Sequence, residues 1–206
     1  MNSIDTNEHI LNRADMINMI AQKIKAKSYL EIGVQTGKTF NNVNITEKVG
    51  VDPDSRWDSQ THLMTSDFFF ETNNQTFDII FVDGLHESEQ CYKDIQNALK
   101  CLNSGGVILV DDVAPKKKEY QTREPTALHW TGDVWRAWIK VRRVSRYHTK
   151  TYDVAFGIGI IDTNETNAAT YWKTTDNIDY DTFRSQFFYE YLNLASAEQF
   201  QRDWNI

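Results

Sequence analysis

The chain has 206 residues, a formal net charge of −7 at pH 7 and a hydrophobic fraction of 40%. This length suits one α/β domain with a full core, and the acidic balance argues against nonspecific nucleic-acid binding, which needs a basic surface. No apolar run approaches the ~20 residues that a membrane-spanning helix needs, and no signal-peptide core opens the chain. We therefore expect one cytoplasmic domain over residues 1–206, either monomeric or a homo-oligomer, with no nucleic-acid or membrane partner.

Residues 5–26 are predicted to form an amphipathic helix that packs against a sheet, with Asp5 and Glu8 as its start signal. One face of this helix carries the apolar residues Ile10, Ala14, Ile17, Ala21 and Ile24.

A short strand begins near Tyr29 and runs into a turn that contains Gly33 and Gly37, and we expect a helix after the turn. A second short strand ends on Asp52, 21 positions after Glu31 (52 − 31). Strand, glycine turn, helix and a strand ending in an acid are typical of a nucleotide or nucleoside site, in which the terminal acid binds the ribose hydroxyls.

Three cofactor classes compete for the glycine turn. A phosphate-binding P-loop needs four residues between its first glycine and Gly-Lys-Thr, whereas three separate Gly33 from Gly37-Lys38-Thr39. A dinucleotide fingerprint needs a middle glycine where this chain has Gln35, and the Glu31 carboxylate would repel a pyrophosphate. The same carboxylate would attract an ammonium group. S-adenosylmethionine, which has an ammonium, a sulfonium and no phosphate, therefore fits best.

A third strand is expected over residues 61–65, leading to Ser66 and Asp67. In this architecture the end of that strand lies near the adenine, so Asp67 could accept from the exocyclic amine and Ser66 could bind a ring nitrogen. A helix cap over a buried aromatic residue explains the same two residues equally well.

The stretch 77–113 contains two apolar runs, Phe77–Val82 and Val107–Val110, on either side of a helical pattern. Both runs are too apolar to have a solvated face, which predicts neighbouring parallel strands covered on both sides. We expect Gly105 and Gly106 to end the helix that lies between the two apolar runs. Its apolar positions are Cys91, Ile95, Ala98, Leu99 and Leu102. Cys91 and Cys101 fit no metal or redox spacing and indicate reduced thiols.

Three carboxylates follow these two strands, Asp83 after the first and Asp111 and Asp112 after the second. Open α/β sheets bind ligands at the carboxyl ends of their strands. A single such Asp is often only a helix cap, but three of them with His86 favour a functional cluster.

The last third of the chain is less regular. Residues 113–130 lack periodicity and contain Lys116–Lys118, which predicts a lid loop over the site with a solvated lysine run. A helix is expected over 131–146, then a hairpin from strands 147–154 and 156–161. The tail, 181–204, is expected to be helical and to cover a sheet edge or form a dimer contact.

Together these motifs resemble those of class I S-adenosylmethionine-dependent methyltransferases, with residues 28–113 carrying the resemblance. The resemblance implies a Rossmann-like α/β domain with a seven-stranded, mostly parallel sheet of order 3-2-1-4-5-7-6, an antiparallel strand seven and helices on both faces. Within the superfamily the chain is most similar to the metal-dependent O-methyltransferases of the catechol and sugar types.

The resemblance also assigns roles. It makes Asp83, Asp111 and Asp112 ligands of a magnesium ion, His86 the general base beside Asp83, and a sugar or glycan-precursor hydroxyl the methyl acceptor. The cofactor residues would be Glu31, Gly33, Gly37, Asp52, Ser66, Asp67 and Asp83. Gln35 and the Asp-Asp pair depart from the catechol-type pattern. Two other functions stay open: a nucleotide-binding protein using Lys38-Thr39 as a degenerate P-loop, and an inactive cofactor-binding scaffold.

Overall fold

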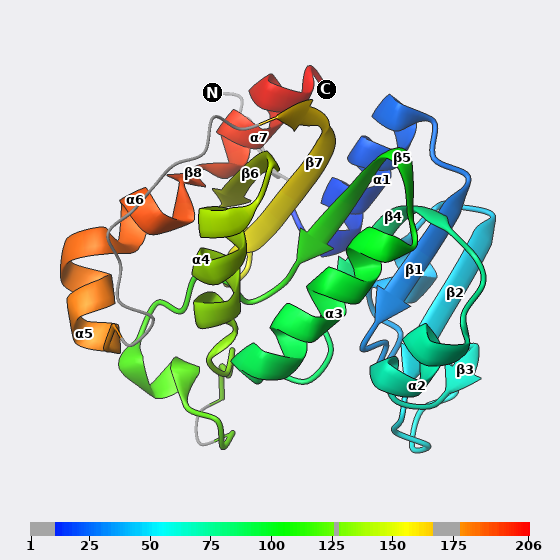
Figure 1. Ribbon diagram of the computed structural model, residues 1–206, viewed down its shortest axis with the longest axis horizontal. Helices are drawn as coiled ribbons and strands as arrows, with labels where there is room; N and C mark the ends of the chain where they lie inside the picture. The colour runs from blue at the N-terminus through cyan, green and yellow to red at the C-terminus, as the bar shows by residue number, and fades with distance from the viewer. Residues whose placement is uncertain (1–10, 126–127, 167–177) are drawn as a thin grey trace, which may run out of the picture.

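A computed structural model describes residues 11–125, 128–166 and 178–206. The chain folds around one sheet in the order β3-β2-β1-β4-β5-β7-β6-β8 (Figure 1). The strands are β1 (Ser28–Ile32), β2 (Glu47–Asp52), β3 (His62–Leu63), β4 (Phe77–Val82), β5 (Leu102–Val110), β6 (Tyr147–Tyr152), β7 (Ile158–Thr166) and β8 (Leu194–Ala195). Only β7 runs antiparallel to its neighbours. The predicted order is confirmed, and β8 extends the predicted seven strands to eight.

Helices cover both faces of the sheet because the central strands are apolar on both sides. Along β4, Ile80 and Val82 pack in one core cluster and Ile79 and Phe81 in the other. The first cluster includes residues of α2, α3, α4 and α6, and the second residues of α1 and α7. The helices are α1 (Arg13–Ile24), α2 (Ser66–Thr72), α3 (Ser88–Lys100), α4 (Val134–Val144), α5 (Tyr180–Thr182), α6 (Phe188–Leu192) and α7 (Ala197–Trp204).

The start of α1 differs from the prediction. Asn12 is the N-cap, and its side chain and that of Asp15 form a reciprocal capping box. The proposed start signal at Asp5 and Glu8 lies outside the described residues. The predicted packing against the sheet is confirmed, since Ile17 and Ile20 are fully buried in the α1 side of the core.

The two glycines expected to end the central helix do not do so. Helix α3 ends at Lys100, and Gly105 and Gly106 lie inside β5, which begins at Leu102. Pairing of Leu102 with Phe77 of β4 draws these residues into the sheet. A Cβ on Gly106 would lie 2.8 Å from the Asp78 carbonyl oxygen, so its glycine permits a close approach of two strands.

The C-terminal tail is not one helix. A π-helical turn, η3 (Phe183–Phe187), lies between α5 and α6, and Asn193 ends α6 in a left-handed conformation with φ 49°. Leu194 and Ala195 then pair with β6 as β8. The tail therefore covers the sheet edge beside β6, which is one of the two roles predicted for it.

The predicted hairpin forms with different bounds, because Gly157 takes φ +92° in the turn and β7 starts after it. The third strand is shorter than expected, with two residues in place of residues 61–65.

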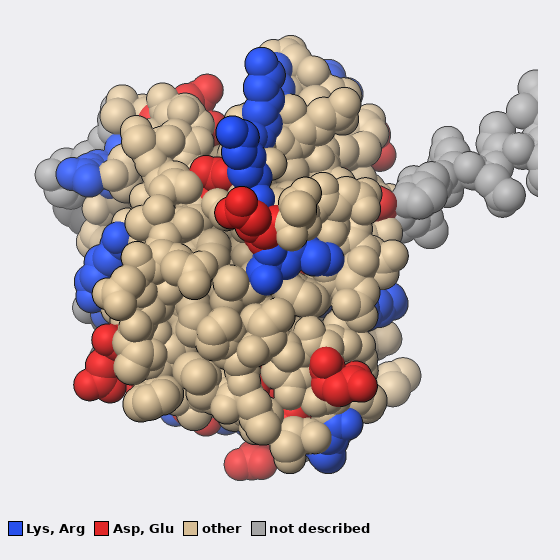
Figure 2. All heavy atoms as spheres, turned by 90° about the vertical axis from the view of Figure 1, so that its right-hand side faces the viewer, with Lys and Arg blue, Asp and Glu red and all other residues tan. Residues whose placement is uncertain are grey.

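On the face drawn in Figure 2, the described acidic and basic side chains are interspersed. No helix in the described ranges is long and apolar enough to cross a membrane.

Candidate functional site

The carboxyl ends of β1, β4 and β5 lie side by side, which brings the loops after them together. Asp83 N–H donates to the Ile32 carbonyl at 2.8 Å, and Asp111 N–H donates to the Val82 carbonyl at 3.0 Å. The predicted convergence of the strand-end residues is therefore observed.

The glycine turn after β1 packs directly on the end of β4. Gly33 has φ +89°, and a Cβ there would lie 1.9 Å from the Asp83 carbonyl oxygen. Gly33 is thus required by the close approach of another segment of this chain. Gly37 also has positive φ, and a Cβ there would lie 2.3 Å from Ser59 Oγ.

The helix expected after the glycine turn is only one 3₁₀ turn, η1 (Phe40–Asn42). A phosphate site of the P-loop type uses the N-terminus of a full helix. The loop around Lys38 therefore lacks the main element of the nucleotide-binding alternative.

Asp52 is buried at the end of β2 and faces the glycine turn. Its Oδ2 accepts from the Gln35 N–H at 2.7 Å, and its Oδ1 accepts from the Asp54 N–H at 2.7 Å. Gln35 itself has φ 45°. The residue that departs from the glycine pattern therefore still adopts a left-handed conformation and contacts the predicted ribose-binding acid through its backbone.

Glu31 is 1% exposed and accepts a hydrogen bond from the Tyr29 hydroxyl at 2.5 Å. Burial raises the pKa of Glu31 to about 8, the Asp83 charge adds to the effect, and Tyr29 and Lys48 oppose it. A buried carboxylate beside a second acid is stabilised by a cation placed near both.

Ser66 and Asp67 start α2 and contact α3. Gln90 Nε2 donates to Asp67 Oδ1 at 2.9 Å and to Ser66 Oγ at 3.2 Å, and Lys93 pairs with Asp67 at 2.6 Å. Thr65 is the N-cap of α2 and accepts from Phe68 N–H. The polar groups predicted to bind adenine therefore already have partners within the chain.

The same glutamine holds Asp94, a buried acid on α3 that lines a small cavity together with Asp83 and Gly84. Asp94 is 1% exposed, and burial raises its pKa to about 6, with Ser66 and Gln90 offsetting part of the shift.

We expect Asp94→Asn to stabilise the protein at neutral pH. Because the folded-state pKa of about 6 lies above the unfolded value of 3.8, the folded state binds this proton more tightly, and stability is lost as pH rises from about 4 through 6. Asparagine cannot ionise, so the gain at pH 7.5 should approach about 3 kcal/mol at most and vanish near pH 4. Urea unfolding at both pH values measures it. A less stable variant at pH 7.5 would show that the ionised carboxylate is favourable here.

Asp83, His86 and Asp112 each offer a ligand atom within 4.8 Å of the others. His86 Nε2 lies 3.4 Å from Asp83 Oδ1, and His86 Nδ1 lies 3.4 Å from Asp112 Oδ2. Burial alone lowers the pKa of His86, but the two carboxylates outweigh it and the pKa is raised. Asp112 has φ 58°, a left-handed conformation that is uncommon outside glycine and recurs at functional sites.

Asp111 is beside this cluster but has another partner. Its Oδ2 forms an ion pair with Arg13 Nε, from the first residue of α1. Burial, followed by the Asp83 charge, raises the pKa of Asp111 to about 8, although Arg13 opposes the shift. Burial, followed by the charges of Asp111 and Asp83, also raises the pKa of Asp112.

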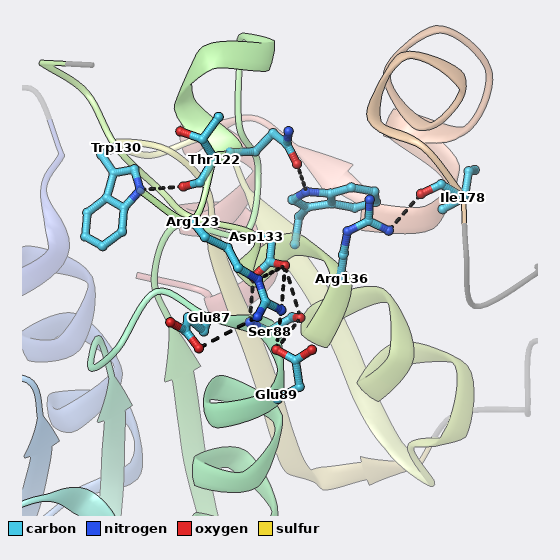
Figure 3. Close-up of polar contacts among 11 residues, drawn as sticks. Glu87, Ser88, Glu89, Thr122, Arg123, Trp130, Asp133, Arg136 and Ile178 are labelled. Atoms are coloured by element: carbon cyan, nitrogen blue, oxygen red, sulfur yellow. Dashed lines mark hydrogen bonds and ion pairs between the residues drawn. The ribbon is translucent and has the colours of Figure 1, made fainter. Parts of the chain in front are cut away.

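Two described residues between 113 and 130, Arg123 and Trp130, contact residues at or just before the start of α3, and Figure 3 draws the contacts of Arg123 with Glu87 and Glu89. The Trp130 ring stacks on His86 with centroids 4.6 Å apart, and Trp130 Nε1 donates to the Thr122 carbonyl at 2.6 Å. Arg123 forms ion pairs with Glu89 and with Asp133, the latter at 3.2 Å. A short helix, η2 (Lys118–Gln121), interrupts the predicted loop, and the lysine run is exposed and paired with surface acids, as expected of a solvated run.

Asp133 fixes the start of the helix that follows His86. Ser88 N–H donates to Asp133 Oδ1 at 2.7 Å, whereas the Glu87 side chain makes no cap bond. Gly132, with φ +56°, packs against the backbone of His86, where a Cβ would lie 1.8 Å from the carbonyl oxygen.

Sequence reasoning did not identify Arg13, Gln90, Asp94 or Trp130 as parts of this region. Helical spacing places Gln90 and Asp94 four residues apart and so on one face of α3, which was the available signal. Arg13 and Trp130 reach the cluster from distant parts of the chain.

Residues 30–113 match a family model described as a methyltransferase domain. None of the curated proteins compared with the sequence matches it. An O-methyltransferase from Bacillus cereus, solved in complex with SAH, is 15% identical with a TM-score of 0.54, covering 75% of this chain and 83% of its own. TomG from Streptomyces achromogenes, an O-methyltransferase involved in tomaymycin synthesis and solved with SAM, is 17% identical with a TM-score of 0.57, covering 73% and 79%.

A methyltransferase from Podospora anserina, PaMTH1, solved with SAH, is 17% identical with a TM-score of 0.54, covering 72% of this chain and 76% of its own. These likenesses show a shared fold, and the family match covers the strands, turn and acids on which the resemblance depended. Residues 30–113 are therefore similar in sequence to a methyltransferase domain, and the chain shares its fold with solved methyltransferases.

Proposed function

We propose that this protein transfers the methyl group of S-adenosylmethionine to a hydroxyl oxygen, with a divalent cation, magnesium for preference, held by Asp83 and Asp112. The observation that carries the proposal is the group of acids beside His86 at the carboxyl ends of β4 and β5, in which Asp83 is partly exposed and Asp111 and Asp112 are buried.

The charges of the cluster fit a divalent cation. When Asp83, Asp111 and Asp112 are all ionised and His86 is neutral, as a bound cation would favour, the cluster with Arg13 carries two negative charges. Asp112 Oδ1 and His86 Nδ1 are buried without a hydrogen bond. Magnesium is usually bound through one or two carboxylates, with waters and substrate completing its shell. The donor set therefore fits the ion that the resemblance implies.

For the cofactor, we propose that Glu31 and Asp83 face the ammonium group and that Asp52 binds the ribose hydroxyls. The mutual repulsion of Glu31 and Asp83 supports a cationic occupant between them. We propose that Ser66 and Asp67 bind the adenine, which requires their side chains to give up contacts with Gln90 and Lys93.

In the proposed reaction, the acceptor oxygen forms a bond to the methyl carbon while the carbon–sulfur bond breaks and releases S-adenosylhomocysteine. His86 takes the hydroxyl proton. A bound divalent cation would supply Lewis acidity, which lowers the pKa of the acceptor hydroxyl. Trp130, stacked on the imidazole, holds the His86 ring in place and shields it from water.

We further propose a sugar or glycan-precursor hydroxyl as the acceptor. Besides Trp130, three rings of the lid and hairpin, Tyr120, His129 and Phe156, contact one another with centroids 5.2–5.8 Å apart. Such a wall suits the apolar face of a sugar ring, with the acids of the cluster binding its hydroxyls.

Calorimetry with S-adenosylmethionine, ATP and NAD, each with and without magnesium, tests the proposal. We expect binding of S-adenosylmethionine alone among the three, and separate binding of magnesium. ATP binding would favour the nucleotide-binding alternative. Cofactor binding without magnesium affinity would favour the inactive scaffold. Turnover is then measured on a panel of sugar nucleotides, glycosides and catechols, in which methylation of catechols alone would contradict the sugar acceptor.

Asp52→Ala should weaken binding of S-adenosylmethionine by about 10- to 100-fold. Loss of a charge-assisted hydrogen bond costs about 1.5–3 kcal/mol, which corresponds to that range. Titration calorimetry measures the change. Asp54→Ala is the matched control, because Asp54 contacts Asp52 only through its backbone N–H and its side chain pairs with exposed Arg56. Wild-type affinity in Asp52→Ala would place the ribose elsewhere.

A further inference from the structure

Arg13, the first residue of α1, also contacts the acidic cluster. Its Nε pairs with Asp111 Oδ2, and its Nη2 lies 3.7 Å from Asp112 Oδ1. The side chain of Asp111 is 1% exposed and that of Arg13 is 30% exposed, so the carboxylate is enclosed while the guanidinium retains some contact with water.

This pairing gives the two adjacent acids, Asp111 and Asp112, different partners. In the described part of the chain, the three-residue group able to hold a cation consists of Asp83, His86 and Asp112, without Asp111. The left-handed conformation of Asp112 turns its side chain toward His86, whereas Asp111 still continues the β5 ladder through its N–H bond to Val82.

We propose that Arg13 is a positioning residue that holds Asp111 as its permanent counter-ion and keeps it out of the ligand set of the cation. Asp83 and Asp112 are then the only carboxylate ligands. Helix α1, which contributes nothing else to the cluster, thereby becomes part of the site. The claim that Asp111 is not a ligand rests on the metal dependence proposed above. The claim that Arg13 is the counter-ion of Asp111 does not.

The physical reason is that an unpaired Asp111 would be strongly unfavourable. It is buried next to two further carboxylates, and removing one partner of a buried ion pair leaves an uncompensated charge. A guanidinium is suited to this place because it stays charged and has several donors in a fixed plane. Asp111 Oδ1 is buried without a hydrogen bond, so the geometric ground for leaving Asp111 out of the ligand set is that the group of ligand atoms within 4.8 Å of one another does not include it.

A double-mutant cycle with Arg13→Gln, Asp111→Asn and both together tests the pairing. Thermal unfolding without divalent cations is the readout. We expect Asp111→Asn to raise the midpoint much more in the Arg13→Gln background than in wild type, because only there does the acid lack its partner. Arg56→Gln, which changes an exposed arginine paired with Asp54, is the control and should not couple to Asp111→Asn. Equal shifts of the midpoint in the wild-type and Arg13→Gln backgrounds would overturn the pairing.

Magnesium titration of the folded variants tests the ligand set. Loss of outer-shell partners already lowers metal affinity by about 10- to 100-fold, so loss of a true ligand in Asp112→Asn should lower it by at least about 100-fold. We expect Asp111→Asn, in contrast, to stay within about threefold of wild type. If Asp111→Asn loses affinity as Asp112→Asn does, Asp111 is a ligand and the inference is wrong. If wild type binds no divalent cation, the proposed metal assistance and the proposed ligand set are both wrong. The double-mutant cycle still tests the pairing of Arg13 with Asp111 in that case.

Discussion

We expect Asp112→Asn to be more stable than wild type without divalent cations and to lose at least about 100-fold of its turnover. Burial, and then the charges of Asp111 and Asp83, raise the pKa of Asp112, so the folded state disfavours the ionised form. For an acid with a raised pKa, stability falls as pH rises above its unfolded value of 3.8, and the gain from asparagine is therefore present at neutral pH. Asparagine also tolerates the φ of 58°, so the backbone is not newly strained.

Scanning calorimetry with and without magnesium measures the stability of Asp112→Asn and of wild type, and steady-state kinetics measures their turnover. The stabilisation that magnesium gives to wild type should disappear in Asp112→Asn. Glu71→Gln, a neutralised exposed acid on α2, is the control and should keep both the magnesium effect and the turnover. A variant that is destabilised without magnesium, yet still stabilised by it, would remove Asp112 from the proposed ligand set.

The sheet was largely predictable because its central strands are buried on both faces. Phe77–Val82 forms β4 with the predicted bounds, since a continuous apolar run between polar residues has few other structures available in an α/β chain. β3 and β8 have two residues each, too few for a periodic pattern. Their places are set by pairing with β2 and β6, which local sequence does not encode.

Element ends were the least predictable part of the fold, because competing contacts decide them. Glycines such as Gly105 and Gly106 are typical of a helix C-terminus. Pairing of Leu102 with Phe77 nevertheless ends α3 earlier. A positive φ at Gln35 could not be inferred from its type, although Gly33 and Gly37 around it indicated a tight turn.

Some features of the candidate site were predictable from the sequence and others were not. Convergence of Asp83 and Asp112 followed from their positions at the ends of adjacent parallel strands, a rule of topology that needs no side-chain detail. Sequence reasoning also separates Asp111 from Asp112, because successive side chains of a strand point in alternate directions. It could not identify Arg13 as the partner of Asp111, since the two are 98 positions apart (111 − 13).

The adenine-binding assignment shows a further difficulty. Ser66 and Asp67 have the residue types that the role needs, but Gln90 and Lys93 on α3 hold their side chains. Sequence supplies the types of such polar groups. Whether they are free for a ligand depends on a packed neighbour 23 or more positions away.

His86→Ala should lower turnover by about 10²- to 10⁴-fold, the usual contribution of general-base catalysis, while leaving S-adenosylmethionine affinity nearly unchanged. The imidazole lies 3.4 Å from both Asp83 and Asp112, so a hydroxyl held at these acids would be within its reach. The main chain at His86 is fixed independently by Gly132 and by the Asp133 cap on Ser88, and truncation should therefore leave the loop in place. Steady-state kinetics on a working acceptor and cofactor titration together give the two quantities.

Magnesium affinity in His86→Ala separates two roles for the imidazole, because the ring could also serve as a third ligand beside Asp83 and Asp112. Unchanged affinity with low turnover is the result expected of a base. A fall in affinity that matches the fall in turnover would make His86 a ligand instead. His148→Ala is the matched control, since this half-exposed histidine on β6 lies near Glu165 and outside the acidic cluster. If His86→Ala retains most of the wild-type turnover, the hydroxyl proton leaves by another route, with Asp83 or water as its acceptor.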